Sequence, residues 1–187
     1  TKSAHEQVKK RALEWTRYAN IHFEFVSDPK EKAEVRVAFD PDDGSWSYIG
    51  TDALAVSDRQ PTMNLGWLDA NVLHEFGHVL GLIHENNNPN AKLPWKKPAV
   101  YRDLGGPPNH WSKEQVDQLF SKSEGIKYRE FDPQSIMSYA YPGSWFLDGR
   151  ARTGGTTLSA SDKRFIRSLY PTERNSSTRR RASPKAR

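Results

Sequence analysis

The sequence predicts an α/β domain of the α+β kind, built in two halves that meet at Gly81. Three observations lead to this fold class. A helical apolar pattern opens the chain, alternating apolar stretches follow it, and a histidine-bearing helix then gives way to a loop-rich remainder with one terminal helix. We expect a twisted mixed sheet with an antiparallel edge strand in the first half (about 1–81). An irregular second half (about 82–171) should face it across a cleft.

The first half begins with an amphipathic helix over 4–19, where apolar residues recur at helical spacing. Alternation of apolar and polar residues predicts strands at 21–25 and 35–39. Residues 40–50 are rich in Asp, Gly, Ser and Pro and should form a loop. Another strand is predicted over 62–67, directly before the histidine-bearing helix, for which Asp69 is a suitable N-cap.

The second half shows less periodicity. Residues 86–108 carry many Asn, Pro and Lys residues and are expected to form a long surface segment. Ser112 and Gln115 have the spacing of a capping box, which predicts a helix after them. A last helix should start at Ser159 or Ser161 and turn three apolar side chains inward: Phe165, Ile166 and Leu169.

Composition limits the classes of protein to consider. The chain has 187 residues and suits one domain over 1–171, followed by a basic tail over 172–187 that we expect to be disordered. The tail holds six basic residues. Without them the chain has 22 basic and 23 acidic residues, so the net charge of +5 belongs to the tail. We therefore expect no nucleic-acid-binding face except through this tail, and the absence of a long apolar run excludes a membrane span.

The most informative stretch is Val-Leu-His-Glu-Phe-Gly-His-Val-Leu-Gly-Leu-Ile-His-Glu. His74 and His78 are four residues apart, so a helix places both imidazoles on one face. Gly81 can take the positive φ that ends a helix, which lets the chain bend back and bring His84 to the same ion. Three histidine ligands with one open position are the pattern of a catalytic zinc site. Cysteine is absent, so thiolate ligands are excluded.

Together with a downstream methionine, this stretch matches the H-E-x-x-H-x-x-G-x-x-H signature of the metzincin proteases. The chain resembles their astacin-like branch, because Glu85 directly follows the third histidine and Ser-Ile-Met-Ser-Tyr over 135–139 is similar to the astacin Met-turn. The stretches 44–50 and 158–171 also look like landmarks of that family. The chain departs from it in having Ser138 where the Met-turn usually has histidine, and in lacking the cysteines of the two common disulfides.

The resemblance implies a zinc metalloendopeptidase with one catalytic zinc ion. His74, His78 and His84 would be the ligands, and Glu75 would be the general base and then the general acid for a metal-activated water. Tyr139 would be a further ligand at rest that stabilises the oxyanion during reaction; the alternative is a buried packing tyrosine.

Two further residues enter through the resemblance. Met137 would pack below the histidine rings, which differs little from an ordinary core methionine. Glu85 would pair with the mature N-terminus, and the alternative is a solvated glutamate.

Substrate binding is predicted at two places. The free edge of the 62–67 strand should pair with an extended peptide, through Met63, Asn64, Leu65, Gly66 and Trp67. A side-chain pocket after the Met-turn should involve Tyr141, Arg150 and Arg152. The two arginines could favour an acidic substrate residue or could simply be exposed loop residues.

We thus expect a secreted, monomeric protease acting on proteins or extended peptides, with secretion implied by the resemblance alone. Two alternatives remain. One is another metzincin family with the same chemistry, and the other is a zinc- or peptide-binding module without turnover.

Overall fold

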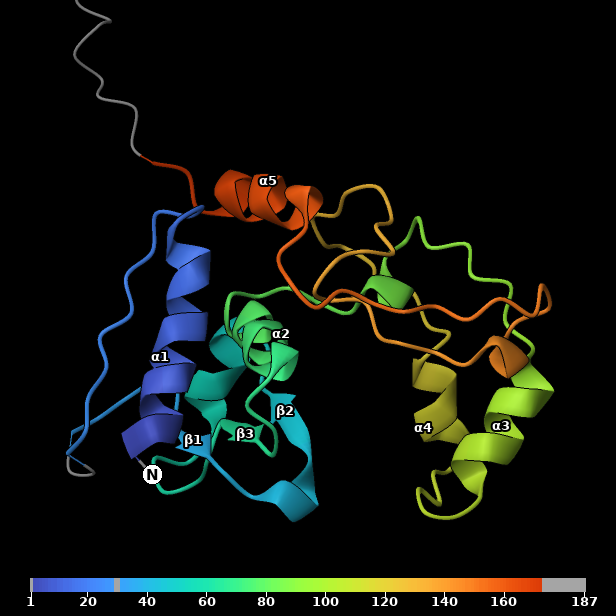
Figure 1. Cartoon of the computed structure of the whole chain (residues 1–187), viewed down its shortest axis with the longest axis horizontal. Helices are drawn as coiled ribbons and strands as arrows, with labels where there is room; N and C mark the ends of the chain where they lie inside the picture. The colour runs from blue at the N-terminus through green and yellow to red at the C-terminus, as the bar shows by residue number, and fades with distance from the viewer. Residues whose placement is uncertain (1, 29–30, 173–187) are drawn as a thin grey trace, which may run out of the picture.

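A small mixed sheet lies beside two helices in the first half of the chain (Figure 1). The computed structural model describes residues 2–28 and 31–172. Strand β3 (Met63–Leu65) is central: β1 (Val37–Ala38) pairs parallel with it and β2 (Ser45–Ser47) pairs antiparallel on its other side. The expected mixed sheet with an antiparallel edge strand is confirmed. The edge strand is β2, however, so the loop predicted over 40–50 is partly wrong.

Two helices cover this sheet and form its core. Helix α1 (Lys2–Thr16) packs against α2 (Ala70–Val79), and Trp15 is fully buried between them. The Trp15 indole donates a hydrogen bond to the carbonyl of Leu73 at 3.0 Å, so this large apolar ring is buried without stranding its N–H group. The helical pattern predicted over 4–19 is confirmed, with the helix starting and ending slightly earlier.

The predicted strand at 21–25 is wrong, and the one at 35–39 is reduced to β1. Residues 21–28 form no ladder, although the Phe23 ring packs edge-on against Phe76 at 5.4 Å between centroids. The alternation of apolar and polar residues indicates that every second side chain contacts the core. This alternation does not indicate whether another strand lies beside the backbone to form hydrogen bonds with it.

The second half contains more helix than predicted. Residues 97–105, within the segment expected to be irregular, form α3 (Lys97–Gly105), which packs on α4 (Lys113–Gln118). Their shared core buries Val100, Leu104 and Val116, with aromatic rings around it: Trp95, Tyr101, Phe120 and Trp145. The sequence did not predict α3 because this helix is short and has a proline in its first turn, a position where proline is tolerated. The capping box of Ser112 and Gln115 on α4 is confirmed.

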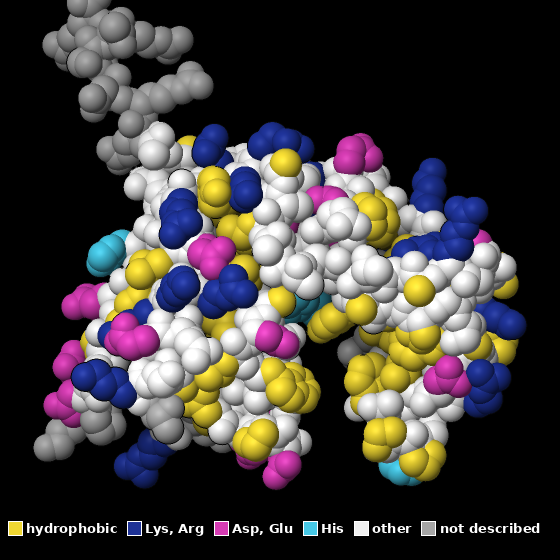
Figure 2. All heavy atoms as spheres, viewed as in Figure 1, with side chains coloured by type: hydrophobic (Ala, Val, Ile, Leu, Met, Phe, Trp, Pro, Cys, Tyr) yellow, Lys and Arg dark blue, Asp and Glu magenta, His cyan; other side chains and the backbone are white. Residues whose placement is uncertain are grey.

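The last helix, α5 (Ala160–Leu169), returns to the first core, where Ile166 is buried in the same cluster as Trp15. Ser159 is its N-cap and forms a capping box with Asp162. Short 3-10 helices occur at Pro41–Asp43, Gly50–Ala55, Glu85–Asn87 and Gly143–Trp145. A hollow separates the α3–α4 part from the sheet, with histidine side chains at its closed end and apolar side chains along its walls (Figure 2).

Within the described residues, no helix has the length and apolar character that a membrane crossing requires. Nearly all of the basic tail predicted over 172–187 lies outside the described residues, which end at 172.

Candidate functional site

Helix α2 carries the first two histidines of the site. Its N-terminus is capped as predicted, with the Asp69 carboxylate accepting a hydrogen bond from the Asn71 backbone N–H at 2.9 Å. His74 and His78 are one turn apart, and both are buried, with 6% and 4% of their surface exposed. Imidazoles buried this deeply need polar partners or a ligand.

The chain reverses at the end of α2. Gly81 has a φ of +83°, and an added Cβ there would meet nothing within 4 Å, so the backbone conformation rather than space requires glycine. The Leu82 N–H donates to the Gly77 carbonyl at 3.0 Å, which closes the helix end. This turn brings His84 back toward α2, as the spacing predicted.

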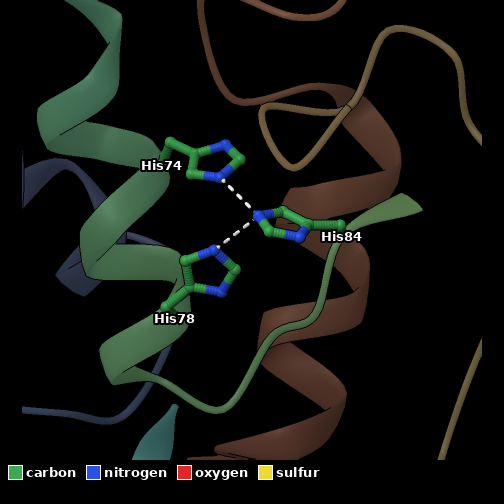
Figure 3. A group of neighbouring side chains, drawn as sticks. All are labelled: His74, His78 and His84. Atoms are coloured by element: carbon green, nitrogen blue, oxygen red, sulfur yellow. Dashed lines mark hydrogen bonds between the residues drawn. The ribbon is translucent and has the colours of Figure 1, made fainter. Parts of the chain in front are cut away.

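Three imidazoles converge at this point (Figure 3). The Nε2 atom of His84 lies 2.9 Å from Nε2 of His78 and 3.1 Å from Nε2 of His74. The Nδ1 atoms of His74 and His78 lie 2.8 Å from the carbonyls of Ile136 and Leu82 and must donate to them, because a carbonyl only accepts. Both Nε2 atoms then present lone pairs to the same point, an arrangement that a cation stabilises.

The three histidines are held neutral, which is the state that binds a metal ion. Burial lowers the pKa of His74, while a backbone hydrogen bond to Ile136 partly opposes that shift. Burial and then the neighbouring His74 lower the pKa of His78 to about 4. Burial and then the other two imidazoles lower the pKa of His84. A set of three nitrogen donors suits zinc well.

Glu75 lies beside this cluster and is 3% exposed. Its Oε2 atom is buried and has no hydrogen-bond partner among the described residues. Burial raises the pKa of Glu75 to about 8. A buried, unpartnered carboxylate oxygen is costly for a fold and is common where a ligand or a reaction uses it.

The Met-turn (135–139) contacts the histidine cluster through Ile136 and Tyr139. The Tyr139 ring stacks on the ring of His74 at 5.1 Å between centroids and approaches that of His84 at 4.4 Å. Burial and then the Glu75 charge raise the pKa of the Tyr139 phenol, although 38% of the whole residue is exposed. Met137 is buried against α2, where an added Cβ at Gly77 would lie 2.4 Å from its sulfur.

Glu85 is buried and ion-paired, so the solvated alternative is wrong. Its Oε1 atom lies 2.7 Å from the Arg129 guanidinium, and its Oε2 accepts from the side chain of Asn88 and from the backbone N–H of Asp132. Nothing in the described residues tests the pairing of Glu85 with a mature N-terminus. Sequence reasoning missed Arg129, because an arginine before the Met-turn stands out in neither spacing nor periodicity.

The predicted free edge at 62–67 is wrong. Strand β3 is paired on both sides, and its three residues are buried: Met63, Asn64 and Leu65. The Gly66 N–H donates to the Gly44 carbonyl, and Trp67 is exposed. The edge that faces the α3–α4 part across the hollow is β2 (Figure 1).

Residues of the predicted side-chain pocket do meet. Tyr141 and Arg152 form an antiparallel bridge, and the Tyr141 hydroxyl donates to Asn86 at 3.1 Å. The Arg152 guanidinium is paired with Asp148 at 2.9 Å and lies over the Phe146 ring, whereas Arg150 is exposed. The charge on Arg152 is thus already compensated within the chain.

Comparisons with known proteins point to a family of peptidases. The family model of astacin (peptidase family M12A) matches residues 1–98. Two structures of myroilysin are each 39% identical to this chain over 92% of its length. They have TM-scores of 0.87 and 0.69, and 89% and 80% of the myroilysin chains is covered. No curated protein matches the sequence.

A more distant structure shows the same fold. High choriolytic enzyme 1, a hatching enzyme zinc-protease from the medaka fish Oryzias latipes, has a TM-score of 0.64 at 15% identity, with 92% of this chain and 85% of that chain covered. The family match, the close structural relatives and the three converging histidines together lead to one assignment. This chain belongs to the astacin family, peptidase family M12A, and is a zinc metalloendopeptidase that acts on proteins or peptides.

Proposed function

We propose that His74, His78 and His84 hold the zinc ion and that Glu75 is the general base of peptide-bond hydrolysis. The observation that carries this proposal is the convergence of three Nε2 atoms beside a buried carboxylate oxygen without a partner. When bound, zinc acidifies a water molecule and polarises the carbonyl of the scissile bond.

Glu75 accepts the proton of the attacking water and delivers it to the leaving amine. Its position next to His74 in the helix supports this role, since the carboxylate then lies beside the ion without binding it. The positive charge of the ion favours the ionised carboxylate, which opposes the effect of burial on its pKa.

Tyr139 is our candidate for oxyanion stabilisation. Its ring contacts two of the three imidazoles, and its phenol is close enough to Glu75 for the carboxylate to raise its pKa. A neutral phenol can donate a hydrogen bond to the negative charge that develops on the substrate carbonyl oxygen.

The extended substrate pairs with the outer edge of β2, which replaces the edge predicted at 62–67. Unpaired N–H and C=O groups of an edge strand bind a peptide backbone whatever its side chains are. The place of β2 at the edge of the sheet supports this, because histidine side chains lie at the closed end of the hollow between the sheet and the α3–α4 part (Figure 2).

The first experiment is peptide hydrolysis by Glu75→Gln. We expect zinc content to stay at that of the wild type, with kcat lowered by roughly 10²- to 10⁴-fold, the usual contribution of a general base. Glu6→Gln is the control, since Glu6 is an exposed glutamate on α1. Removal of zinc with a chelator should abolish wild-type activity, and added zinc should restore it. A zinc-loaded wild type without peptidase activity would support the binding-module alternative instead.

Tyr139→Phe tests the tyrosine separately. The ring remains and packing is preserved, so we expect unchanged zinc content and thermal stability, with kcat lowered by roughly 10²- to 10³-fold. Steady-state kinetics with one peptide substrate measures this. An unchanged kcat would leave Tyr139 as a packing residue.

A further inference from the structure

A largely buried arginine, Arg129, is paired with two carboxylates, one of which directly follows His84 in the chain. The side chain of Arg129 is 15% exposed, and its Nη2 atom lies 2.7 Å from both Glu85 Oε1 and Asp162 Oδ1. The side chains of Glu85 and Asp162 are 6% and 0% exposed. Buried charges of this kind persist only when they are paired and hydrogen-bonded.

One branch of contacts runs from Arg129 to His74. Asp162 accepts hydrogen bonds from the Ser135 hydroxyl at 2.7 Å and from the backbone N–H of Ile136 at 2.9 Å, so its carboxylate fixes the start of the Met-turn. The carbonyl of the same Ile136 accepts from Nδ1 of His74 at 2.8 Å. The orientation of this imidazole therefore depends on the backbone of Ile136, whose N–H group Asp162 holds in place.

A second branch runs from Arg129 to His84. Glu85 is the next residue after His84, and its backbone N–H donates to the carbonyl of Met137 at 3.0 Å. With its carboxylate held by Arg129 and its backbone held by the Met-turn, Glu85 has little freedom to rotate. This restrains His84, which lies outside the α-helices, at the N-cap of the short 3-10 helix Glu85–Asn87.

We propose that Arg129 is the positioning residue of the zinc site, an assignment that rests on the proposed histidine ligands. Its guanidinium joins the segment after His84, the Met-turn and the first turn of α5. These three pieces are far apart in sequence, and without a common cation the carboxylates of Glu85 and Asp162 repel each other in a buried space.

The geometry favours arginine over lysine at this position. The guanidinium reaches Glu85, Asp162 and the Ser135 hydroxyl, and it lies over the Phe165 ring at 5.7 Å. An ammonium group is a point charge that does not reproduce these fixed directions.

The test is the rate at which the zinc-loaded protein releases zinc to an excess of a colorimetric chelator, without substrate. We expect Arg129→Met to release zinc roughly 10- to 100-fold faster than the wild type, which is the usual effect of losing a group that orients metal ligands. Arg129→Lys should fall between the two. Should Arg129→Met fail to fold, the lysine variant decides the question.

Arg36→Met is the matched control. Arg36 donates to four backbone carbonyls, those of Ala33, Val56, Ser57 and Gln60, none of which belongs to the Met-turn or to the histidine cluster. Its loss should lower thermal stability while leaving zinc release within about twofold of the wild type, since no metal ligand depends on it. Equal acceleration in both arginine variants would mean general loosening of the fold and would overturn the proposal, as would wild-type release by Arg129→Met.

A double variant sharpens the result. In Glu85→Gln/Arg129→Met the buried charge on Glu85 is removed together with its partner, so we expect zinc release no faster than in the more affected single variant. If the two substitutions multiply each other's effect on the rate of zinc release, Glu85 and Arg129 do not act through the same set of contacts. Because release is measured without peptide, a failure of the proposed hydrolysis would leave this comparison intact.

Discussion

The two parts of the zinc site are built by different means. His74 and His78 are placed by the regular geometry of α2, which fixes them one turn apart whatever surrounds the helix. His84, Met137 and Tyr139 lie on irregular backbone and are placed by buried polar contacts that converge on Asp162 and Arg129. A helix supplies half of the site from local sequence alone, whereas the other half needs residues from distant segments.

The contact between the two parts is tightest at Gly77, which makes Gly77→Ala the largest expected effect. An added Cβ would lie 2.4 Å from the Met137 sulfur and 3.3 Å from the Trp15 ring, so the Met137 side chain must shift within the packed core. Overpacking of this kind costs about 1–3 kcal/mol, and thermal unfolding of the zinc-loaded protein measures it. Gly105→Ala in α3 is the control, because its nearest atom would be 3.8 Å away and alanine favours helix. Equal stability of the two variants would show that the contact is loose.

Gly81→Ala tests the point where regular geometry ends. The added Cβ meets no atom, so the cost comes only from the left-handed backbone, about 1–2 kcal/mol. We expect weaker zinc binding together with this loss, since His84 follows the turn. Zinc affinity measured by competition with a chelator checks it. A stability loss with unchanged affinity would mean that the Met-turn contacts alone place His84.

The smallest effect concerns substrate choice in the irregular part. Arg152 is paired with Asp148, so we expect the wild type to show little preference for acidic substrate residues. Asp148→Asn removes the compensating carboxylate and should increase cleavage next to acidic residues by a few-fold, the size of a partly exposed ion pair. Cleavage-site profiling on a peptide library compares the two proteins. A strong acidic preference in the wild type would contradict this account of Arg152.

The features that were predicted correctly from the sequence are those that depend on neighbouring residues. The spacing of His74, His78 and Gly81 and the caps at Asp69, Ser112 and Ser159 are all found in the structure, because each depends on residues within one or two turns. Two predictions about strands were wrong: residues 21–25 form no strand, and the strand within 62–67 has no free edge. Alternating burial of side chains does not say whether a strand is paired or on which side. The role of Arg129 was missed for a related reason. Its partners Glu85 and Asp162 are distant in sequence, and only the fold brings them together.

The central claim is that three imidazoles from two differently built segments bind one zinc ion and leave a position open for chemistry. Diffraction from crystals of the zinc-loaded protein at the zinc absorption edge tests it most directly. We predict a single anomalous peak bound by Nε2 of His74, His78 and His84, with Glu75 beside the ion and not bound to it. A peak elsewhere, or an ion bound without His84, would contradict the account.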